Sequence, residues 1–361
     1  MLLRLLIALA AAFPALSTAS PSMSAGAAPA PWAAASTVQV SSRDIEFQSG
    51  GVKLSGTLYS PAGRKALAAV VVLHGASSPL RDLPLYAHLR TSLPALGMAV
   101  FVYDRRGSGK SIPATGSHDF DLLSDDGVAA AEMLRRQPEI DPKRVGYWGL
   151  SQGGWLALMC AAKDPKAAFA VSVSAPIVPP DVQMNYAVAN ILHVDGYSQA
   201  DIHQAVQMRR AIDGYLKGTL DRAPAERLLA EARDKPWFKL TYTDSELEDP
   251  ATSSWLKQMR LDPIKTLERV KVPTLMIYGA DDPWVPVGVS VQTLTARAAD
   301  FPAMELRVIP HADHTMMLGV DPKAQMDPNA FAAEAPDSPE YFMTLAAWLT
   351  ERGLARADGR L

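Results

Sequence analysis

The chain has 361 residues and a formal net charge of −3, from 35 basic and 38 acidic side chains. This near-neutral balance, without a basic run, excludes nucleic acid as an expected partner. The single cysteine, Cys160, excludes an internal disulfide and a thiolate zinc cluster, and its place in an apolar helical run predicts packing in the core.

The first 19 residues have the pattern of a secretory signal peptide. Arg4 precedes an apolar run at 5–12, and Ser17-Thr18-Ala19 offers small residues for cleavage. The apolar run is short for a membrane span, so we expect no stable membrane anchor, with an uncleaved anchor as the alternative. Residues 20–36 are rich in Ala, Pro and Ser and predict a flexible linker. We therefore expect a periplasmic or secreted protein.

From residue 38 onward, predicted strands and helices alternate, which is typical of a parallel sheet with helices on both faces. Residues 38–47 and 52–59 alternate apolar and polar side chains around Ser49-Gly50-Gly51, which predicts an antiparallel hairpin at one edge of the sheet. The next elements are a strand at 67–73, a helix at 85–96, a strand at 98–103, a helix at 121–136, and strands at 145–150 and 168–174.

This alternation stops at Pro179. From there to about Trp255 the pattern is helical and amphipathic, with helices predicted at 199–216 and 223–232. A capping-box match, Ser198-Gln199-Ala200-Asp201, opens the first of them. We interpret this region as a helical cap inserted into the domain.

Two strands and a helix complete the predicted domain, at 272–278, 305–309 and 340–350. The predicted organisation is a core of α/β class over 37–178 and 263–353, a cap over 179–262 and a tail over 354–361.

A candidate nucleophile lies where the strand at 145–150 gives way to an apolar helix. Residues 149–153 read Gly-Leu-Ser-Gln-Gly, and a Gly-x-Ser-x-Gly sequence in this context predicts a sharp turn that exposes the serine hydroxyl. Gly149 and Gly153 leave room for the turn, and Gly154 allows the helix to pack closely. We therefore predict that Ser151 is a nucleophile. The alternative is a tight turn with a structural serine.

A serine hydroxyl needs a base, and the base needs an orienting carboxylate. In an open parallel sheet these groups gather at the carboxyl ends of strands. His314 follows the last predicted strand, so it is the predicted base. His311 and His74 are the alternatives, and hydrogen-bonded loop structure is the simpler role for both.

The predicted orienting acid is Asp282, in the loop after the strand at 272–278. Its neighbour Asp281 is the first alternative, because two adjacent carboxylates cannot both face one imidazole. Asp181, further along the chain from the strand at 168–174, is a remote alternative.

The oxyanion of an acyl-transfer reaction needs two backbone donors. One predicted donor is the N–H of Gln152, directly after the nucleophile. The other should come from the loop after the strand at 67–73, and Ala76 is the predicted residue because it has no side chain to obstruct the approach.

The chain order Ser151, Asp282, His314, with His74-Gly75 upstream, resembles the α/β-hydrolase superfamily over roughly Val38 to Gly353. The stretches DRRGSGKS and GLSQGGW, which begin at residues 104 and 149, are similar to bacterial carboxylesterases near the serine aminopeptidases and prolyl-peptidase-like enzymes. No Gly-Gly-Gly follows His74, which argues against the hormone-sensitive-lipase type.

This resemblance implies a mostly parallel eight-stranded sheet of the α/β-hydrolase fold, with an inserted helical cap, and hydrolysis through an acyl-enzyme. It also implies that residues 104–111 brace the site, with Arg105 or Arg106 in a salt bridge near the nucleophile turn.

The sequence thus predicts an exported serine hydrolase that cleaves small-molecule carboxylic esters with no metal or organic cofactor. A peptidase is the first alternative, with a cap carboxylate holding a substrate ammonium group. The candidates for that role are Asp244, Glu246, Glu248 and Asp249. Thioester or lactone cleavage by the same groups, and a non-catalytic binding protein on the same fold, are further alternatives.

Five apolar or aromatic residues of the predicted cap either line an acyl pocket or pack the cap itself. They are Met184, Tyr186, Trp237, Phe238 and Trp255. The acyl and alcohol groups of the substrate and the oligomeric state are left open by the sequence.

Overall fold

The computed structural model describes residues 38–112, 116–327 and 335–356. The predicted signal peptide, the linker and the end of the predicted tail lie outside these residues. The chain divides into two compact units, a larger one up to residue 187 and from 257 onward, and a smaller one whose described part is 188–256. No helix in the described ranges combines the length and the apolar character that a membrane span requires.

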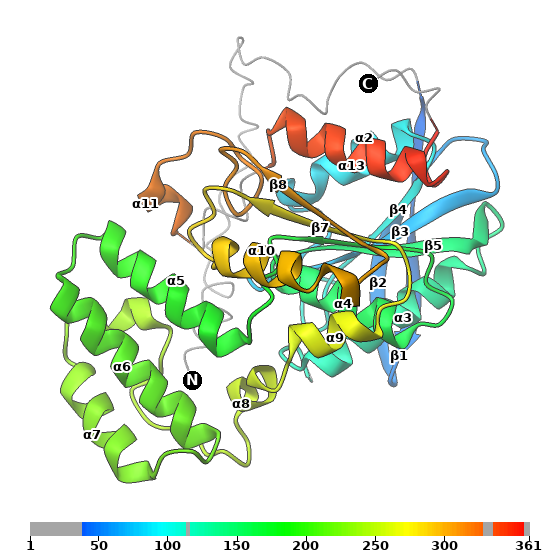
Figure 1. Ribbon diagram of the computed structural model, residues 1–361. Coiled ribbons are helices and arrows are strands. Elements are labelled where there is room, and N and C mark those ends of the chain that lie inside the picture. The colour runs from blue at the N-terminus through cyan, green and yellow to red at the C-terminus, as the bar shows by residue number, and fades with distance from the viewer. Residues whose placement is uncertain (1–37, 113–115, 328–334, 357–361) are drawn as a thin grey trace, which may run out of the picture. The chain divides into compact units, whose positions relative to one another are not determined.

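The larger unit is built on a single eight-stranded sheet (Figure 1). Its strands are β1 (Val40–Ser49), β2 (Val52–Pro61), β3 (Leu67–Leu73), β4 (Ala99–Tyr103), β5 (Ile140–Leu150), β6 (Ala170–Val173), β7 (Thr274–Gly279) and β8 (Met304–Ile309). They lie in the order β1-β2-β4-β3-β5-β6-β7-β8. Strand β2 is antiparallel to both its neighbours, and all other pairs are parallel. The predicted edge hairpin and mostly parallel sheet are therefore confirmed.

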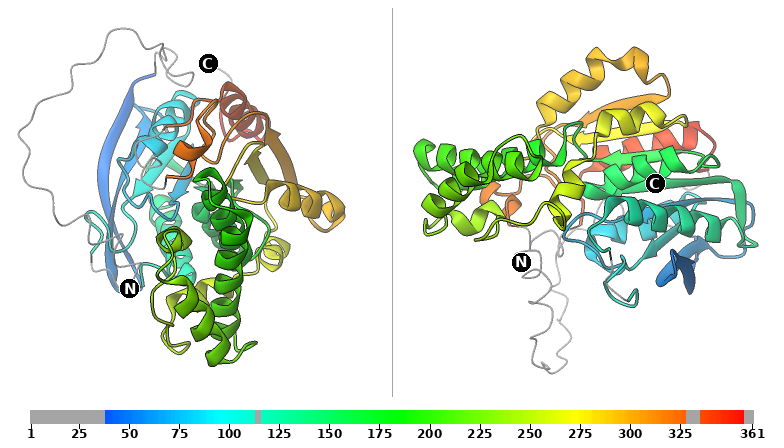
Figure 2. Two further views of the ribbon diagram at one scale, coloured as in Figure 1. Left: turned by 90° about the vertical axis from the view of Figure 1, so that its left-hand side faces the viewer. Right: turned by 90° about the horizontal axis from the view of Figure 1, so that it is seen from below.

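Helices cover both faces of this sheet, as Figures 1 and 2 show. They are α2 (Ala87–Ala95), α3 (Phe120–Leu134), α4 (Gln152–Lys163), α9 (Pro263–Arg269), α10 (Val287–Ala296) and α13 (Pro339–Glu351). The larger unit also contains the short helix α11 (Pro322–Gln325), in the segment after β8, and the 3-10 turns η3 (Pro84–Tyr86) and η5 (Ala298–Asp300). Two more helices, α5 (Pro180–Val194) and α8 (Ser254–Met259), cross the boundaries between the units.

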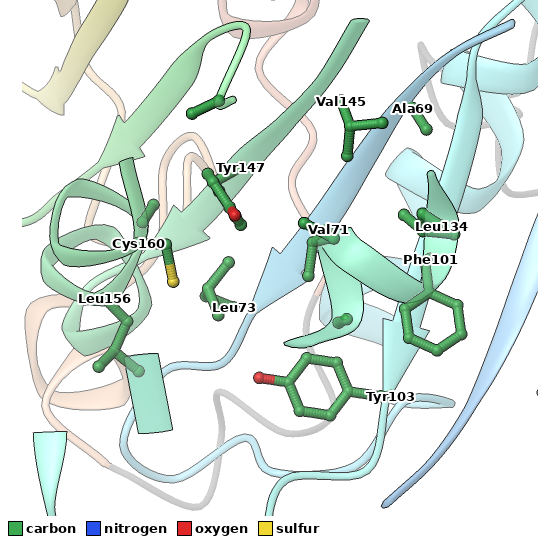
Figure 3. Packing of buried hydrophobic residues seen from close by; sticks show 14 of the residues in the cluster. Ala69, Val71, Leu73, Phe101, Tyr103, Leu134, Val145, Tyr147, Leu156 and Cys160 are labelled. Atoms are coloured by element: carbon green, nitrogen blue, oxygen red, sulfur yellow. The ribbon is translucent and has the colours of Figure 1, made fainter. Parts of the chain in front are cut away.

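Strands β3 and β4 carry only apolar or aromatic residues, because both of their faces are buried. In β3, Val71 and Leu73 face the cluster that contains α3 and α4, whereas Val70 and Val72 face the cluster that contains α2 and α13. Figure 3 shows the first cluster, in which Cys160 is fully buried. The Cys160 thiol donates a hydrogen bond to the carbonyl of Ser124, 3.2 Å away, so the predicted packing role is confirmed.

Among the boundaries that differ from the sequence prediction, the following have a clear structural origin. The helix predicted from residue 85 begins with the 3-10 turn η3, and α2 starts only at Ala87. Strand β5 starts at Ile140 because this residue pairs with Leu67 ahead of a register shift in the β3–β5 ladder. At the C-terminus, Leu354 and Ala355 are buried in the α2–α13 cluster, so the predicted tail is packed at its start.

The smaller unit contains α6 (Gln199–Leu216), α7 (Arg222–Ala232) and the 3-10 turn η4 (Phe238–Thr241). Helices α6 and α7 run side by side (Figure 2). The predicted capping box is present, since the Ser198 side chain accepts from the N–H of Asp201 and the Asp201 side chain accepts from the N–H of Ser198.

Two tryptophans of the smaller unit donate hydrogen bonds to carboxylates of the same unit. Trp237 is fully buried and its indole N–H donates to Asp201, 3.1 Å away. The indole of Trp255 donates to Asp213 at 2.8 Å. These contacts favour the packing role for both tryptophans over an acyl-pocket role.

Candidate active site

The turn between β5 and α4 holds Ser151 in a strained conformation. Its φ of 58° and ψ of −124° lie in a region that residues with a side chain rarely adopt. The Ser151 N–H donates to the carbonyl of Val173 on β6, 2.8 Å away, which anchors the turn to the sheet. A Cβ added at Gly149 would overlap the Gly153 backbone, and one at Gly153 would overlap the Leu73 carbonyl. The room that the sequence analysis assigned to these two glycines is therefore required.

Asp282 and His314 meet in the loops that follow β7 and β8. Their Oδ2 and Nδ1 atoms are 2.7 Å apart, and the two side chains are 0% and 6% exposed. The other oxygen of Asp282 accepts from the N–H groups of Trp284 (2.8 Å) and Val285 (3.2 Å). An ionised carboxylate only accepts hydrogen bonds, so Nδ1 of His314 carries the proton and Nε2 is left as the basic nitrogen.

The backbone connects the loops after β7 and β8. The N–H of Ala280 donates to the carbonyl of Ile309 at 2.9 Å, and the N–H of Asp281 donates to that of Ala312 at 3.0 Å. A Cβ at Gly279 would overlap the backbone of residues 312 and 313, so only glycine allows this approach. The relative position of Asp282 and His314 is thus set by main-chain contacts between neighbouring strands.

Two side chains that the sequence analysis did not single out support this pair. The indole of Trp284 lies beside the His314 ring, with 6.4 Å between centroids, and its N–H donates to the carbonyl of Gln325 at 2.6 Å. Asp313 is buried and accepts from the N–H of Thr315 at 2.8 Å and from that of Met317 at 2.9 Å. Burial raises the pKa of Asp313 from its ordinary value, partly opposed by these hydrogen bonds.

The alternative bases and acids lie in other surroundings. His311 and Asp281 face each other at 3.7 Å on the surface, with side chains 87% and 60% exposed. His74 is buried, and burial, with a smaller effect of Arg105, lowers its pKa to about 3. Asp181 lies in the first turn of α5.

The loop after β3 contains the predicted oxyanion donor Ala76. This loop lies beside the end of β5, as the close approach of Gly75 shows: a Cβ added there would be 3.5 Å from the Leu150 carbonyl oxygen. The Tyr86 hydroxyl accepts from the N–H of Gly75 at 3.3 Å and donates to the carbonyl of Ser78 at 2.8 Å. Burial raises the pKa of Tyr86 to about 12, so it stays a neutral hydroxyl.

The expected salt bridge of the DRRGSGKS stretch is formed by only one of its two arginines. Arg106 pairs with Asp126 of α3 at 2.5 Å. Arg105 forms no ion pair with any described residue and donates instead to main-chain carbonyls of the loop after β3. The preceding aspartate, Asp104, braces the stretch by accepting from the N–H of Arg81 (3.1 Å) and Lys110 (2.9 Å).

The predicted groups share one rim of the sheet. Ala76, Ser151, Asp282 and His314 follow β3, β5, β7 and β8, and these strands are parallel, so their carboxyl ends lie at the same edge. The N–H groups of Ala76 and Gln152 donate to no acceptor among the described residues. In those same ranges no three His, Cys, Asp or Glu side chains gather as a metal site.

A family model described as serine aminopeptidase, S33, matches residues 64–321, more than half of the chain. The chain belongs to this family. Its fold is that of the α/β-hydrolase superfamily, so the fold inferred from sequence is confirmed.

Curated relatives match part of the chain, and a solved structure shares its fold. A thiohydrolase of Arthrinium phaeospermum is 35% identical over 147 residues, which cover 38% of this chain and 44% of that protein. A quorum-quenching protein of Acinetobacter baumannii is 35% identical over 131 residues, covering 36% and 42%. The matches thus span less than half the length of these relatives. An esterase structure from Pyrococcus furiosus has a TM-score of 0.53 at 20% identity, covering 86% of this chain and 90% of that one, which is a likeness of fold.

Proposed function

We propose that this S33-family protein is a serine hydrolase that cleaves carboxylic esters through an acyl-enzyme on Ser151. The hydrogen bond of 2.7 Å between Asp282 and the buried His314, on the sheet rim that carries the strained Ser151 turn, is the observation that supports it. A strained turn has a cost of order 1–3 kcal/mol, and such turns persist where they present a group for chemistry.

In this mechanism the Ser151 hydroxyl oxygen attacks the ester carbonyl while Nε2 of His314 takes its proton. The tetrahedral intermediate then collapses, the bond to the alcohol oxygen breaks, and His314 returns the proton to the leaving alkoxide. Asp282 keeps His314 in the required tautomer and stabilises the imidazolium. Water enters next, His314 removes its proton, and attack on the acyl-enzyme releases the carboxylic acid and restores Ser151.

The negative oxygen formed at each tetrahedral stage needs donors that are in place beforehand. The N–H groups of Ala76 and Gln152 supply them, the latter at the N-terminus of α4, where the helix dipole also favours negative charge. Removing one such donor typically costs about 3 kcal/mol of transition-state stabilisation.

Thioester cleavage is a second candidate, favoured by the relatives described as thiohydrolases. The same groups serve it, and a thiolate leaves more readily than an alkoxide because a thiol has a pKa of about 8.5. A peptidase would need a carboxylate for the substrate ammonium group. Among the four predicted carboxylates, Asp249 accepts from the N–H of Ala251 at 2.9 Å, a bond typical of a structural turn.

We also propose that the protein is exported, since residues 1–19 have the pattern of a signal peptide. The expected location is the periplasm or the medium.

The proposal is tested with the mature chain, a fluorophosphonate probe and parallel substrates. We expect labelling at Ser151 and hydrolysis of p-nitrophenyl butyrate faster than of aminoacyl-nitroanilides, with butyryl thioesters as a third arm. Ser151→Ala should lose about 10⁶ in kcat. Ser41→Ala, on the edge strand β1, is the control and should keep full activity. A folded protein that the probe leaves unlabelled would refute the serine mechanism, and faster nitroanilide hydrolysis would move the assignment to a peptidase.

A further inference from the structure

Arg105 is a buried cation that no described carboxylate neutralises. It is 7% exposed, and it follows β4 directly after Asp104, whose carboxylate is occupied by Arg81 and Lys110. Burial lowers the pKa of Arg105, but a guanidinium group stays protonated in proteins. An unpaired buried charge is costly, so its position calls for an explanation beyond packing.

The guanidinium group holds the loop that contains the predicted oxyanion donor. Its NH1 nitrogen donates to the carbonyl of Gly75 at 3.2 Å, and its NH2 nitrogen donates to that of Ala76 at 3.0 Å. The remaining nitrogen, Nε, is buried without a hydrogen-bond partner among the described residues. The two loop carbonyls are therefore what orients this side chain.

The planarity of the peptide bond links these contacts to the reaction. In a trans peptide, the carbonyl of one residue and the N–H of the next point in opposite directions. The carbonyl of Gly75 and the N–H of Ala76 belong to the same peptide unit. When Arg105 draws that carbonyl toward itself, the Ala76 N–H must point away from Arg105, on the opposite side of the loop.

We propose that Arg105 is a positioning residue that orients and polarises the Ala76 N–H as an oxyanion donor. This inference rests on the proposed serine-hydrolase function and names a group that acts through the main chain, without touching substrate. A charged donor on the carbonyl strengthens the hydrogen bond that the N–H of the same peptide can give. The positive charge also lies one peptide away from the site where negative charge develops.

The chain offers a matched control in Arg90. Its guanidinium group likewise donates to main-chain carbonyls, those of Arg81 at 2.6 Å and Leu83 at 3.2 Å, in a segment that carries no predicted donor. Arg90→Met therefore removes the same kind of bond, from arginine to backbone, without disturbing the Gly75–Ala76 peptide.

The test compares Arg105→Met, Arg105→Lys and Arg90→Met with the unmodified mature enzyme. Active sites are counted with a fluorophosphonate so that kcat refers to folded enzyme. Removing a donor costs about 10²–10³ in rate, and a misdirected donor should cost less, so we expect kcat of Arg105→Met to fall about 10- to 100-fold. KM should change less than about 3-fold, because the ester carbonyl gains its charge only in the transition state.

A second readout separates orientation from general stability. An alkyl trifluoromethyl ketone forms a tetrahedral oxyanion on the serine, so its Ki should rise by about the same factor as kcat falls. Arg105→Lys should be intermediate, because one ammonium group can reach one carbonyl but not bridge two. Arg90→Met should lose thermal stability without a change in kcat or Ki.

Three results would overturn the inference. Unchanged kcat and Ki in Arg105→Met would assign the residue to structure alone, and equal losses in Arg90→Met would show that any such arginine has the effect. If Arg105→Met does not fold, full activity of Arg105→Lys would likewise assign the residue to structure alone. Failure of the proposed function is recognised separately, since the unmodified enzyme would then show no Ser151-dependent labelling.

Discussion

Asp282→Asn tests the His–Asp pair most sharply, because the structure fixes how the new amide must lie. In the unmodified chain, one carboxylate oxygen accepts from the N–H groups of Trp284 and Val285, and the other meets Nδ1 of His314 at 2.7 Å. The asparagine side chain of the variant has one oxygen and one NH₂ group. Two backbone donors require the oxygen, so the NH₂ group must face Nδ1.

The expected effect follows from the tautomer. An NH₂ group only donates, so Nδ1 of His314 must become the acceptor and the proton must move to Nε2. Nε2, which the proposed mechanism uses as the base, then carries a proton and can no longer accept one. The same exchange in a Ser-His-Asp triad on another fold lowers kcat about 10⁴-fold, which corresponds to about 5 kcal/mol. Folding stability should change little, because both backbone bonds to the residue are kept.

The assay is kcat for p-nitrophenyl butyrate at pH 8, with thermal unfolding as the check on folding. Asp281→Asn is the matched control, because its carboxylate is 60% exposed and lies 3.7 Å from the surface residue His311. It should stay within about 2-fold of the unmodified enzyme. A folded Asp282→Asn enzyme with more than a tenth of normal kcat would refute the reasoning, and so would an equal loss in Asp281→Asn.

Two further predictions concern folding stability. Gly153→Ala should lower the free energy of unfolding by about 1–3 kcal/mol, because the new Cβ overlaps the Leu73 carbonyl. Gly288→Ala on α10, where a Cβ meets nothing within 4 Å, should be neutral or slightly stabilising, and equal melting temperatures of the two variants would contradict this. Burial lowers the pKa of His88 from 6.5 to about 3, so the unfolded chain binds its proton first and stability falls as the pH drops from 6.5 toward 3. Between pH 7.5 and 5, His88→Gln should therefore lose about 2 kcal/mol less unfolding free energy than the unmodified protein, as measured by urea titration. If the unfolding free energies of the variant and the unmodified protein fall in parallel over this range, the idea is wrong.

At the candidate site, local pattern and strand position are the features that a sequence can specify. The strand–turn–helix around Ser151 has a local signature, since small residues must flank a strained serine. Asp282 and His314 follow strands whose ends meet at one rim, which is why the sequence singles them out, and the structure places these two side chains in contact. The parallel topology thus indicates that residues far apart in the sequence lie close together in space.

The parts that sequence reasoning missed are contacts made with the main chain. The family resemblance implies a salt bridge for Arg105 or Arg106, and Arg106 forms one with Asp126. The partners of Arg105 are instead the carbonyls of Gly75 and Ala76, and carbonyls are the same in every residue type. The packing of Trp284 beside His314 depends on where the loop after β7 turns back, which is set by tertiary structure.

The candidate site has two parts, and a different set of contacts holds each part in place. On one side, Ser151 and the loop of Ala76 are fixed by close backbone approaches among β3, β5 and α4, together with hydrogen bonds from Arg105. On the other side, Asp282 and His314 are fixed by main-chain bonds between the loops after β7 and β8. Strand β6 lies between these parts and pairs with both β5 and β7. Since a parallel ladder resists sliding, the distance between Ser151 and His314 is governed by the sheet itself. In the proposed mechanism, preorganisation therefore comes from the backbone more than from side-chain packing.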